Sequence, residues 1–156
     1  MPRTLTAAIA LLATTATAAP WTAGTTIQPL TLHDQHGAQR QLDDHTKLLV
    51  VTRDMDAGNL VKTALTDRPP TFLEEQSALY IADISRMPAV VTRLFALPSL
   101  RRRPYPILLD RDGKSTAEIP TKDKHATIIT LDNLKVVTVD HISTPDKLVE
   151  ALVRHQ

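Results

Sequence analysis

Cysteine is absent from this sequence of 156 residues. Without a thiol the chain can carry out no thiol–disulfide exchange, has no cysteine nucleophile, and holds no thiolate metal site or iron–sulfur cluster. It can form no disulfide either, so its stability depends on a packed core. This absence excludes whole classes of redox function.

Glycine and aromatic residues are also scarce, and the net charge is nearly zero. Only four glycines occur and aromatic residues make up 3 %, so a glycine-rich phosphate loop has little material and the core is aliphatic. A formal net charge of +1 gives no general attraction to nucleic acid or to an acidic surface. A hydrophobic fraction of 42 % and a charged fraction of 22 % are typical of one globular domain of this length.

The sequence has no long apolar run either, and the apolar run near its start is short. Arg3 precedes an apolar run over residues 7–13, and small residues including Ala16 and Ala18 follow it. This is the pattern of a secretory signal, with cleavage expected after Ala18. A membrane anchor is the alternative, but the run is well below the ~20 residues that span a bilayer. We therefore expect a leader over residues 1–18 and an exported domain over residues 19–156, in the periplasm or secreted.

The stretch on which the rest of the chain is organised is an apolar run followed by a polar turn. Residues 48–52 (LLVVT) are uninterrupted by charge, which favours a strand buried on both faces. Residues 53–58 form the turn, and apolar residues at helical spacing follow it. The sequence thus predicts a buried strand, a turn and a helix.

The remaining pattern predicts a mixed sheet flanked by helices on both faces, an α/β fold. A hairpin is expected over residues 27–32 and 39–42, a second parallel strand over residues 79–82, and a short strand over residues 107–109. Between the last two, Ser85 is expected to cap a helix that buries Val90, Val91, Leu94 and Phe95 and ends at Pro98. A late hairpin over residues 127–131 and 136–139 and a last helix after Thr144 complete the order.

Three segments give this order a family resemblance. Residues 30–37 (LTLHDQHG) are similar to an opening F-x-L-x-D-x-x-G hairpin, residues 106–113 (PILLDRDG) to a P-x-L-x-D-x-x-G insert, and residues 126–132 (ATIITLD) to a P-T-x-x-x-I-D strand. In this order and spacing they resemble the thioredoxin-like superfamily, in its branch of peroxiredoxins and periplasmic thiol–disulfide oxidoreductases. The resemblance covers nearly all of residues 19–156 and implies a thioredoxin-like mixed sheet with an N-terminal β-hairpin.

The chain departs from that family at the positions that matter for its chemistry. The active cysteines of the family follow its first core strand, where this chain has residues 53–58. Ala126 stands where the family has a cis-proline, and a cis bond before a non-proline residue costs about 2.5–4 kcal/mol, so we expect a trans bond. Leu134 stands where a turn glycine is usual. The resemblance therefore implies a cysteine-less member without redox activity.

The turn and the loop before residue 126 form the candidate binding groove. Ligands of open α/β sheets bind beyond the carboxyl ends of parallel strands. The candidate residues are Arg53, Asp54, Met55, Asp56, His125, Ala126 and Thr127. Arg53 could hold a carboxylate and Met55 could line an apolar edge. The alternative is an ordinary helix start with Asp54 or Asp56 as its cap.

Two other features could bind a ligand. A copper or zinc site would draw on the six histidines, with His125 and Met55 as the sharpest pair for copper; the six are His33, His36, His45, His125, His141 and His155. Scattered surface histidines are the alternative. Arg101, Arg102 and Arg103 could contact anionic lipid, a polysaccharide or an acidic partner, or form a solvated loop.

The interpretation that best fits these features is an exported thioredoxin-like module that binds a protein or peptide. It is expected to be a monomer or weak dimer, with no cofactor, no nucleic-acid partner and no transmembrane segment after cleavage. A periplasmic metal-handling protein is the first alternative. A non-thiol enzyme in the same cleft is the second, although no nucleophile with a placed base is evident in the sequence.

Overall fold

The computed structural model describes residues 19–154. The predicted leader and the candidate ligand His155 lie outside the described residues. Within residues 19–154, no helix is both long enough and apolar enough to cross a membrane.

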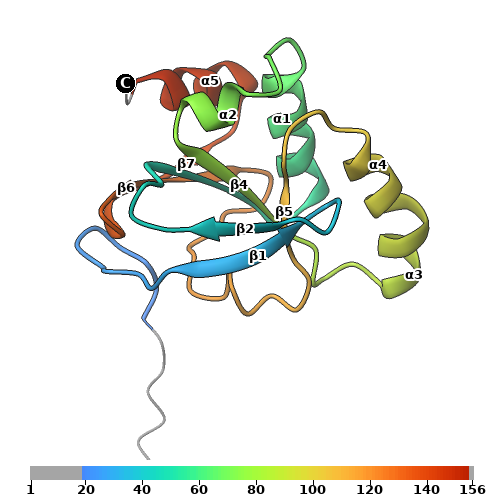
Figure 1. Ribbon diagram of the computed structural model, residues 1–156, viewed down its shortest axis with the longest axis horizontal. Coiled ribbons are helices and arrows are strands. Elements are labelled where there is room, and N and C mark those ends of the chain that lie inside the picture. Colours follow the sequence, from blue (N-terminus) through green and yellow to red (C-terminus); the bar gives the residue numbers. More distant parts are fainter. Residues whose placement is uncertain (1–18, 155–156) are drawn as a thin grey trace, which may run out of the picture.

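A seven-stranded mixed sheet forms the centre of the fold (Figure 1). Its strands lie in the order β2-β1-β5-β4-β3-β6-β7; β4 runs parallel to β3 and to β5, and the other neighbours are antiparallel. The strands are β1 (Leu30–Asp34), β2 (Gln39–Leu42), β3 (Leu48–Thr52), β4 (Ala78–Asp83), β5 (Leu108–Asp110), β6 (Ala126–Asp132) and β7 (Lys135–Ile142). The predicted mixed sheet and its N-terminal hairpin are confirmed.

The helices gather on one face of this sheet (Figure 1). They are α1 (Met55–Leu65), α2 (Phe72–Glu75), α3 (Ala89–Val91), the π-helical turn η1 (Thr92–Ala96), α4 (Leu97–Arg101) and α5 (Pro145–Val153). Their buried residues join one apolar cluster with the alternate strand residues Leu48 and Val50. On the far face, Leu49 and Val51 pack with coil residues such as Ile119. The sheet is flanked by helices as predicted, but among the described residues they cover one face rather than both.

Strand β3 is buried along its whole length, as the uninterrupted apolar run predicts. Its four apolar side chains are each 0 % exposed, and they alternate between the two clusters because successive side chains of a strand point to opposite faces. Aliphatic side chains dominate both clusters, in keeping with the scarcity of aromatic residues. The core thus fixes the end of β3, where the turn begins.

The α3–η1–α4 segment differs most from the sequence-based prediction. Val90, Val91, Leu94 and Phe95 are 66 %, 40 %, 59 % and 68 % exposed, so the prediction that they form a buried face is wrong. The helical segment is held to the core through Met87, Leu97 and Leu100 instead. Its amphipathic pattern is real, but its apolar stripe has no cover within residues 19–154.

Pro98 does not end this helical segment, which continues to Arg101. Proline lacks the amide hydrogen and its ring clashes with the carbonyl of the preceding turn in a regular α-helix. Here a π-helical turn comes immediately before α4, and the Leu97 amide donates to the Thr92 carbonyl five residues back. The wider turn accommodates the proline ring.

The last hairpin turn shows how the chain manages without the usual glycine. Asn133 and Leu134 both have positive φ, at 46° and 64°, in the turn that joins β6 to β7. Two consecutive residues with positive φ are typical of the type I′ turn, whose twist matches that of the antiparallel strands it joins. The bond before Ala126 is trans as expected, since the described residues contain no cis peptide.

Candidate functional site

The turn after β3 is the start of a capped helix. Asp54 is the N-cap of α1, and its Oδ1 accepts a 2.8 Å bond from the Ala57 amide. Its Oδ2 accepts a 2.8 Å bond from the Lys124 amide, and Lys124 has a φ of 63°. Asp54 therefore starts α1 and holds the loop before β6 against the turn.

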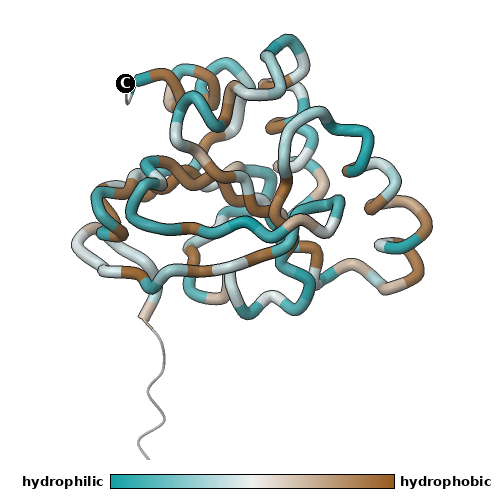
Figure 2. The backbone as a smooth tube through the Cα atoms, in the orientation of Figure 1, coloured by the Kyte–Doolittle hydropathy of each residue, from teal (hydrophilic) through white to brown (hydrophobic). Residues whose placement is uncertain are grey.

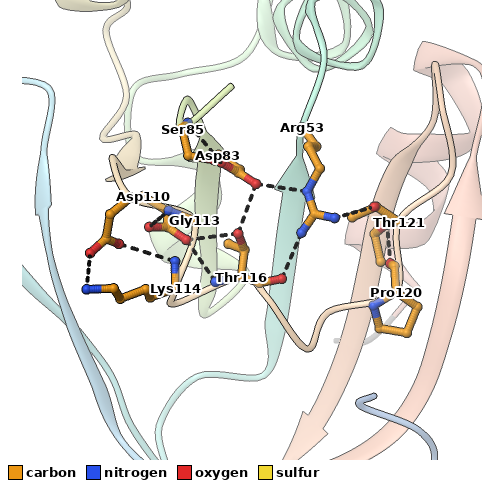
Figure 3. Close-up of polar contacts among 11 residues, drawn as sticks. Arg53, Asp83, Ser85, Asp110, Gly113, Lys114, Thr116, Pro120 and Thr121 are labelled. Carbon is orange, nitrogen blue, oxygen red and sulfur yellow. Dashed lines mark hydrogen bonds and ion pairs between the residues drawn. The ribbon is translucent and has the colours of Figure 1, made fainter. Parts of the chain in front are cut away.

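The guanidinium of Arg53 contacts groups of the protein itself (Figure 3). Its Nε donates to Asp83 Oδ2 at 2.8 Å, and its two terminal nitrogens donate to Thr121 Oγ1 at 2.9 Å and to the Thr116 carbonyl at 2.8 Å. The side chain is only 18 % exposed. Its suggested role as a carboxylate-binding group thus competes with three bonds inside the protein.

Asp83 and Asp110 form the centre of a buried polar network (Figure 3). They end the adjacent parallel strands β4 and β5 and lie opposite each other in register. The Thr116 hydroxyl lies 2.8 Å from Asp110 Oδ2 and 3.1 Å from Asp83 Oδ2, so it joins the two carboxylates. The Gly113 and Thr116 amides also donate to Asp110. The network locks the loop after β5 to the end of β4.

Ser85 serves this network instead of capping a helix as predicted. Its amide and hydroxyl donate to Asp83 Oδ1 at 3.0 and 2.7 Å, while Pro88 is the residue before α3. Gly113 lies so close that an added Cβ would sit 2.7 Å from the Ser85 hydroxyl, and its φ is 73°. A larger residue at Gly113 would therefore push Ser85 off Asp83.

The pKa of Asp83 is set by two opposing effects. Burial raises the pKa of this carboxyl, but the hydrogen bonds from Ser85, Arg53 and Thr116 together outweigh burial and leave the pKa below its usual value. Asp83 is thus an anion at neutral pH, paired with the Arg53 cation. Within residues 19–154, every buried side-chain nitrogen or oxygen has a hydrogen-bond partner. The network is satisfied internally, as a structural element is.

An open groove lies beside the turn, between the start of α1 and the α3–η1–α4 segment, and Arg53 and Asp83 of the polar network also line it. Its volume is about 350 Å³, and its floor includes Thr52, Tyr80 and Ala82. Met55 and Phe95, which are 70 % and 68 % exposed, form its rims. The groove is predominantly apolar and opens to solvent.

The floor of the groove is neutral despite its hydroxyl groups. Burial raises the pKa of Tyr80 to about 12, and its phenol lies 3.0 Å from the Thr52 hydroxyl. The two hydroxyls satisfy each other, so they impose no charge on a ligand. Burial also raises the pKa of Tyr105.

Arg103 supplies positive charge at the edge of this groove. It is half-buried, lines the groove, and acts electrostatically on both Tyr80 and Tyr105. No acidic side chain of the described part of the chain forms an ion pair with it. Asp54 and the Arg53–Asp83 pair also line the groove, so among its charged residues Arg103 is the cation without an ion pair within residues 19–154.

The structure divides the seven candidate residues between different places. Arg53, Asp54 and Met55 line the groove, and Met55 with Asp56 also borders a shallow hollow beside Lys124. Thr121 and Lys124 make the polar contacts between loop and turn, and His125 Nδ1 instead lies 2.7 Å from the Asp123 carbonyl. Ala126 and Thr127 are buried in β6 and line neither cavity.

Thr127 and His141 form a small polar cluster under that loop. The Thr127 hydroxyl donates to the Pro120 carbonyl at 3.0 Å and lies 3.2 Å from His141 Nδ1. Burial, with the nearby His125 and Lys122, lowers the pKa of His141. His141 is therefore disposed to be neutral near neutral pH.

The arrangement of the histidines gives little support to a metal-binding site. Within residues 19–154, the one close group of potential ligands is Asp43, Asp44 and His45. His45 is 88 % exposed, and its Nδ1 lies 2.9 Å from Asp44 Oδ1. The sharper candidate His125, like His33, His36 and His141, is not part of this group.

Sequence reasoning missed both the polar network and the groove wall. The network had a usable signal, because Asp83 and Asp110 each end a short apolar run and the ends of parallel strands meet at one edge of a sheet. The groove wall could have been found from the amphipathic stripe of residues 90–95, but the sequence pattern predicts that stripe as part of the core.

Comparison with known proteins supports the fold. No protein-family model and no curated protein matches the chain. Among solved structures, the chain is similar to a peroxidoxin from Mycobacterium tuberculosis, with 20 % identity, TM-score 0.54, and coverage of 86 % of this chain and 97 % of that one. A peroxiredoxin-like protein from Aquifex aeolicus has 9 % identity, TM-score 0.55, and coverage of 89 % and 90 %. The thioredoxin domain of a thiol–disulfide oxidoreductase from Bacteroides vulgatus has 12 % identity, TM-score 0.51, and coverage of 85 % and 96 %.

These similarities establish a thioredoxin-like fold, and the chain that adopts it has no cysteine. The resemblance noted from the sequence is confirmed at the level of the fold. At these identities, the redox chemistry that those names describe is a property of the similar proteins and is not transferred to this chain.

Proposed function

We propose that this chain is an exported thioredoxin-like module, a monomer or weak dimer, that binds an apolar segment of a protein or peptide. The observation that carries the proposal is the open apolar groove beside the turn, with the exposed side chains of Met55 and Phe95 at its rims. Large apolar side chains are seldom left exposed together around a concave surface unless a partner covers them.

The occupant is a peptide segment rather than a redox substrate. The chain has no thiol to exchange, and Arg53, in the turn beside the groove, donates to three internal acceptors. A volume of about 350 Å³ is near the lower end for ligand pockets, which suits one or two large side chains better than a large cofactor. The leader pattern of residues 1–18 supports an exported location.

Charge narrows the choice of segment. Arg103 is half-buried at the groove and has no ion pair within residues 19–154, so it favours a carboxylate near the apolar anchor. A charge-assisted bond in a partly desolvated site is stronger than one between neutral groups. The ligand class is therefore an apolar segment with a neighbouring acidic side chain or a C-terminal carboxylate.

Selection from a library of short random peptides tests the proposal. Peptides enriched on the wild type should share a large apolar residue next to an acidic one. Met55→Ser with Phe95→Ser should weaken their binding by about tenfold or more, since each change removes an apolar anchor. Arg103→Gln should weaken only the peptides that carry the acid.

A matched control is available on the same molecule. Val137 and Val153 are 47 % and 42 % exposed and lie outside the groove, so Val137→Ser with Val153→Ser should leave peptide binding unchanged. The proposal fails if no peptide is enriched, or if the groove and control variants bind the enriched peptides equally well.

A further inference from the structure

The outer face of the α3–η1–α4 segment carries a second apolar feature, distinct from the groove. Val91 and Phe95 line the groove, whereas Val90 and Leu94 do not, although they are 66 % and 59 % exposed. Four residues apart on one helical segment, Val90 and Leu94 form an outward ridge. Figure 2 shows hydrophobic colour along this segment at the edge of the molecule. We call Val90 and Leu94 the outer ridge.

The same segment has an unbalanced positive charge. Residues 84–109 contain five arginines and no acidic residue; the five are Arg86, Arg93, Arg101, Arg102 and Arg103. Since the whole chain carries +1, the residues outside this segment together carry −4. The described part of the chain provides no ion pair to any of the five. Basic charge is thus concentrated on the segment that carries the outer ridge, although Arg103 lines the groove and Arg101 donates to the Gln35 carbonyl.

We propose that the outer ridge and its arginines dock on an anionic lipid surface. An amphipathic helix with apolar side chains on one side and arginine beside them lies in the plane of a membrane, with its apolar face among the acyl chains. Arginine side chains are long enough to reach phosphate groups while their stems stay on apolar surface. All of these residues lie within 84–109, outside the predicted leader.

A lipid surface fits these residues better than a folded acidic partner. A stable protein interface needs about 1,000 Å² of well-packed surface, which two exposed apolar side chains cannot supply. A lipid surface has mobile headgroups and needs no matching shape. It also gains from each basic residue, which strengthens binding to an anionic leaflet roughly fivefold.

Vesicle co-sedimentation tests the docking. The chain from Ala19 onward is used because the apolar run over residues 7–13 would itself bind lipid, and every described strand and helix lies in the part retained. We expect binding to phosphatidylcholine vesicles that contain about one-third phosphatidylglycerol, and weak or no binding to phosphatidylcholine alone. Raising the salt from about 0.1 M to about 0.5 M should weaken binding strongly.

Two pairs of variants separate the apolar from the electrostatic contribution. Val90→Ser with Leu94→Ser should weaken binding to the anionic vesicles by about tenfold, whereas Val137→Ser with Val153→Ser should not change it. Arg86→Gln with Arg93→Gln should also weaken it by about tenfold or more. Lys62→Gln with Lys147→Gln removes the same charge from exposed positions on α1 and α5, and should have a much smaller effect.

The docking proposal is overturned if the wild type binds anionic and neutral vesicles alike, or if it binds neither. It is also overturned if the ridge variant binds as the wild type does. Peptide binding in the groove is measured separately and depends on Met55 and Phe95. The ridge variant keeps both, so failure of one proposal does not imply failure of the other.

Discussion

The two sides of the turn after β3 are built in opposite ways. Behind it, Arg53, Asp83, Thr116 and Asp110 form a network in which charge and hydrogen bonds are matched inside the protein. In front of it, the α3–η1–α4 segment exposes large apolar side chains, and its arginines form no ion pair with any residue of the described part of the chain. The first side is closed and the second is open.

This difference separates stability from binding. A buried polar group that has its partners contributes to folding, and removing a partner leaves a desolvation cost. An exposed apolar group contributes little to folding and is available to another molecule. Substitutions in the polar network should therefore change the free energy of unfolding, and those of the exposed apolar side chains in front of the turn should change binding alone.

The largest effect is expected from Arg53→Met. The change leaves Asp83, which is 3 % exposed, without its cation, and breaking one half of a buried ion pair costs about 3–5 kcal/mol. Urea denaturation should show that loss in the free energy of unfolding. Arg93→Met removes the same charge from the exposed helical segment and should cost less than about 0.5 kcal/mol. Equal losses in the two variants would contradict the division described above.

A smaller loss is expected from Thr116→Val, which keeps the shape of the side chain. It removes the hydroxyl that lies between Asp83 and Asp110 in a fully buried position, at a cost of about 1–3 kcal/mol. Thr138→Val on β7 removes an exposed hydroxyl and should be nearly neutral. Thermal melts of both variants measure the difference, and a Thr116→Val protein as stable as the wild type would show that the hydroxyl does not join the carboxylates.

The acid dependence of stability should report Asp83. Its pKa is lowered in the folded state, so the folded protein binds fewer protons than the unfolded chain near the usual pKa of 3.8. The stability that Asp83 contributes is present above that value and is lost as the pH falls through the folded pKa. Asp83→Asn should thus lose less stability than the wild type between about pH 5 and about pH 2, measured by urea melts. Parallel pH curves would argue against an ionised Asp83.

The smallest effect is expected from Tyr80→Phe at the groove floor. The change removes a hydroxyl pair with Thr52 and should cost about 1 kcal/mol at neutral pH. Because the pKa of Tyr80 is raised from 10.0 to about 12, the folded protein holds a proton that the unfolded chain loses, and wild-type stability should fall over that range. Tyr80→Phe should show a shallower alkaline fall, with Tyr105 accounting for part of what remains. An unchanged alkaline slope would place the Tyr80 phenol in contact with water.

The sequence predicted what depends on local pattern. The apolar run of β3 and the N-terminal hairpin each follow from residues a few positions apart, and the alternative of a helix start capped by Asp54 or Asp56 is equally local; the structure has Asp54 as the cap. The polar network joins residues from position 53 to position 121, so no local pattern could specify which donor meets which acceptor. The stripe of Val90, Val91, Leu94 and Phe95 shows that one face is apolar, but periodicity cannot say whether the fold supplies a cover. A proline such as Pro98 is expected to end a regular α-helix, and the π-helical turn that accommodates it here has no simple sequence pattern.

The groove between α1 and the α3–η1–α4 segment is the proposed peptide site. Mapping amide chemical shifts of the ¹⁵N-labelled chain as a library-selected peptide is added tests this proposal most directly. The proposal predicts shifts concentrated at groove residues such as Met55, Gly58, Phe95 and Ser99, with Asp110 and Thr116, the network residues that do not line the groove, unperturbed. Shifts centred on His125 and Thr127 instead, or absent altogether, would contradict it.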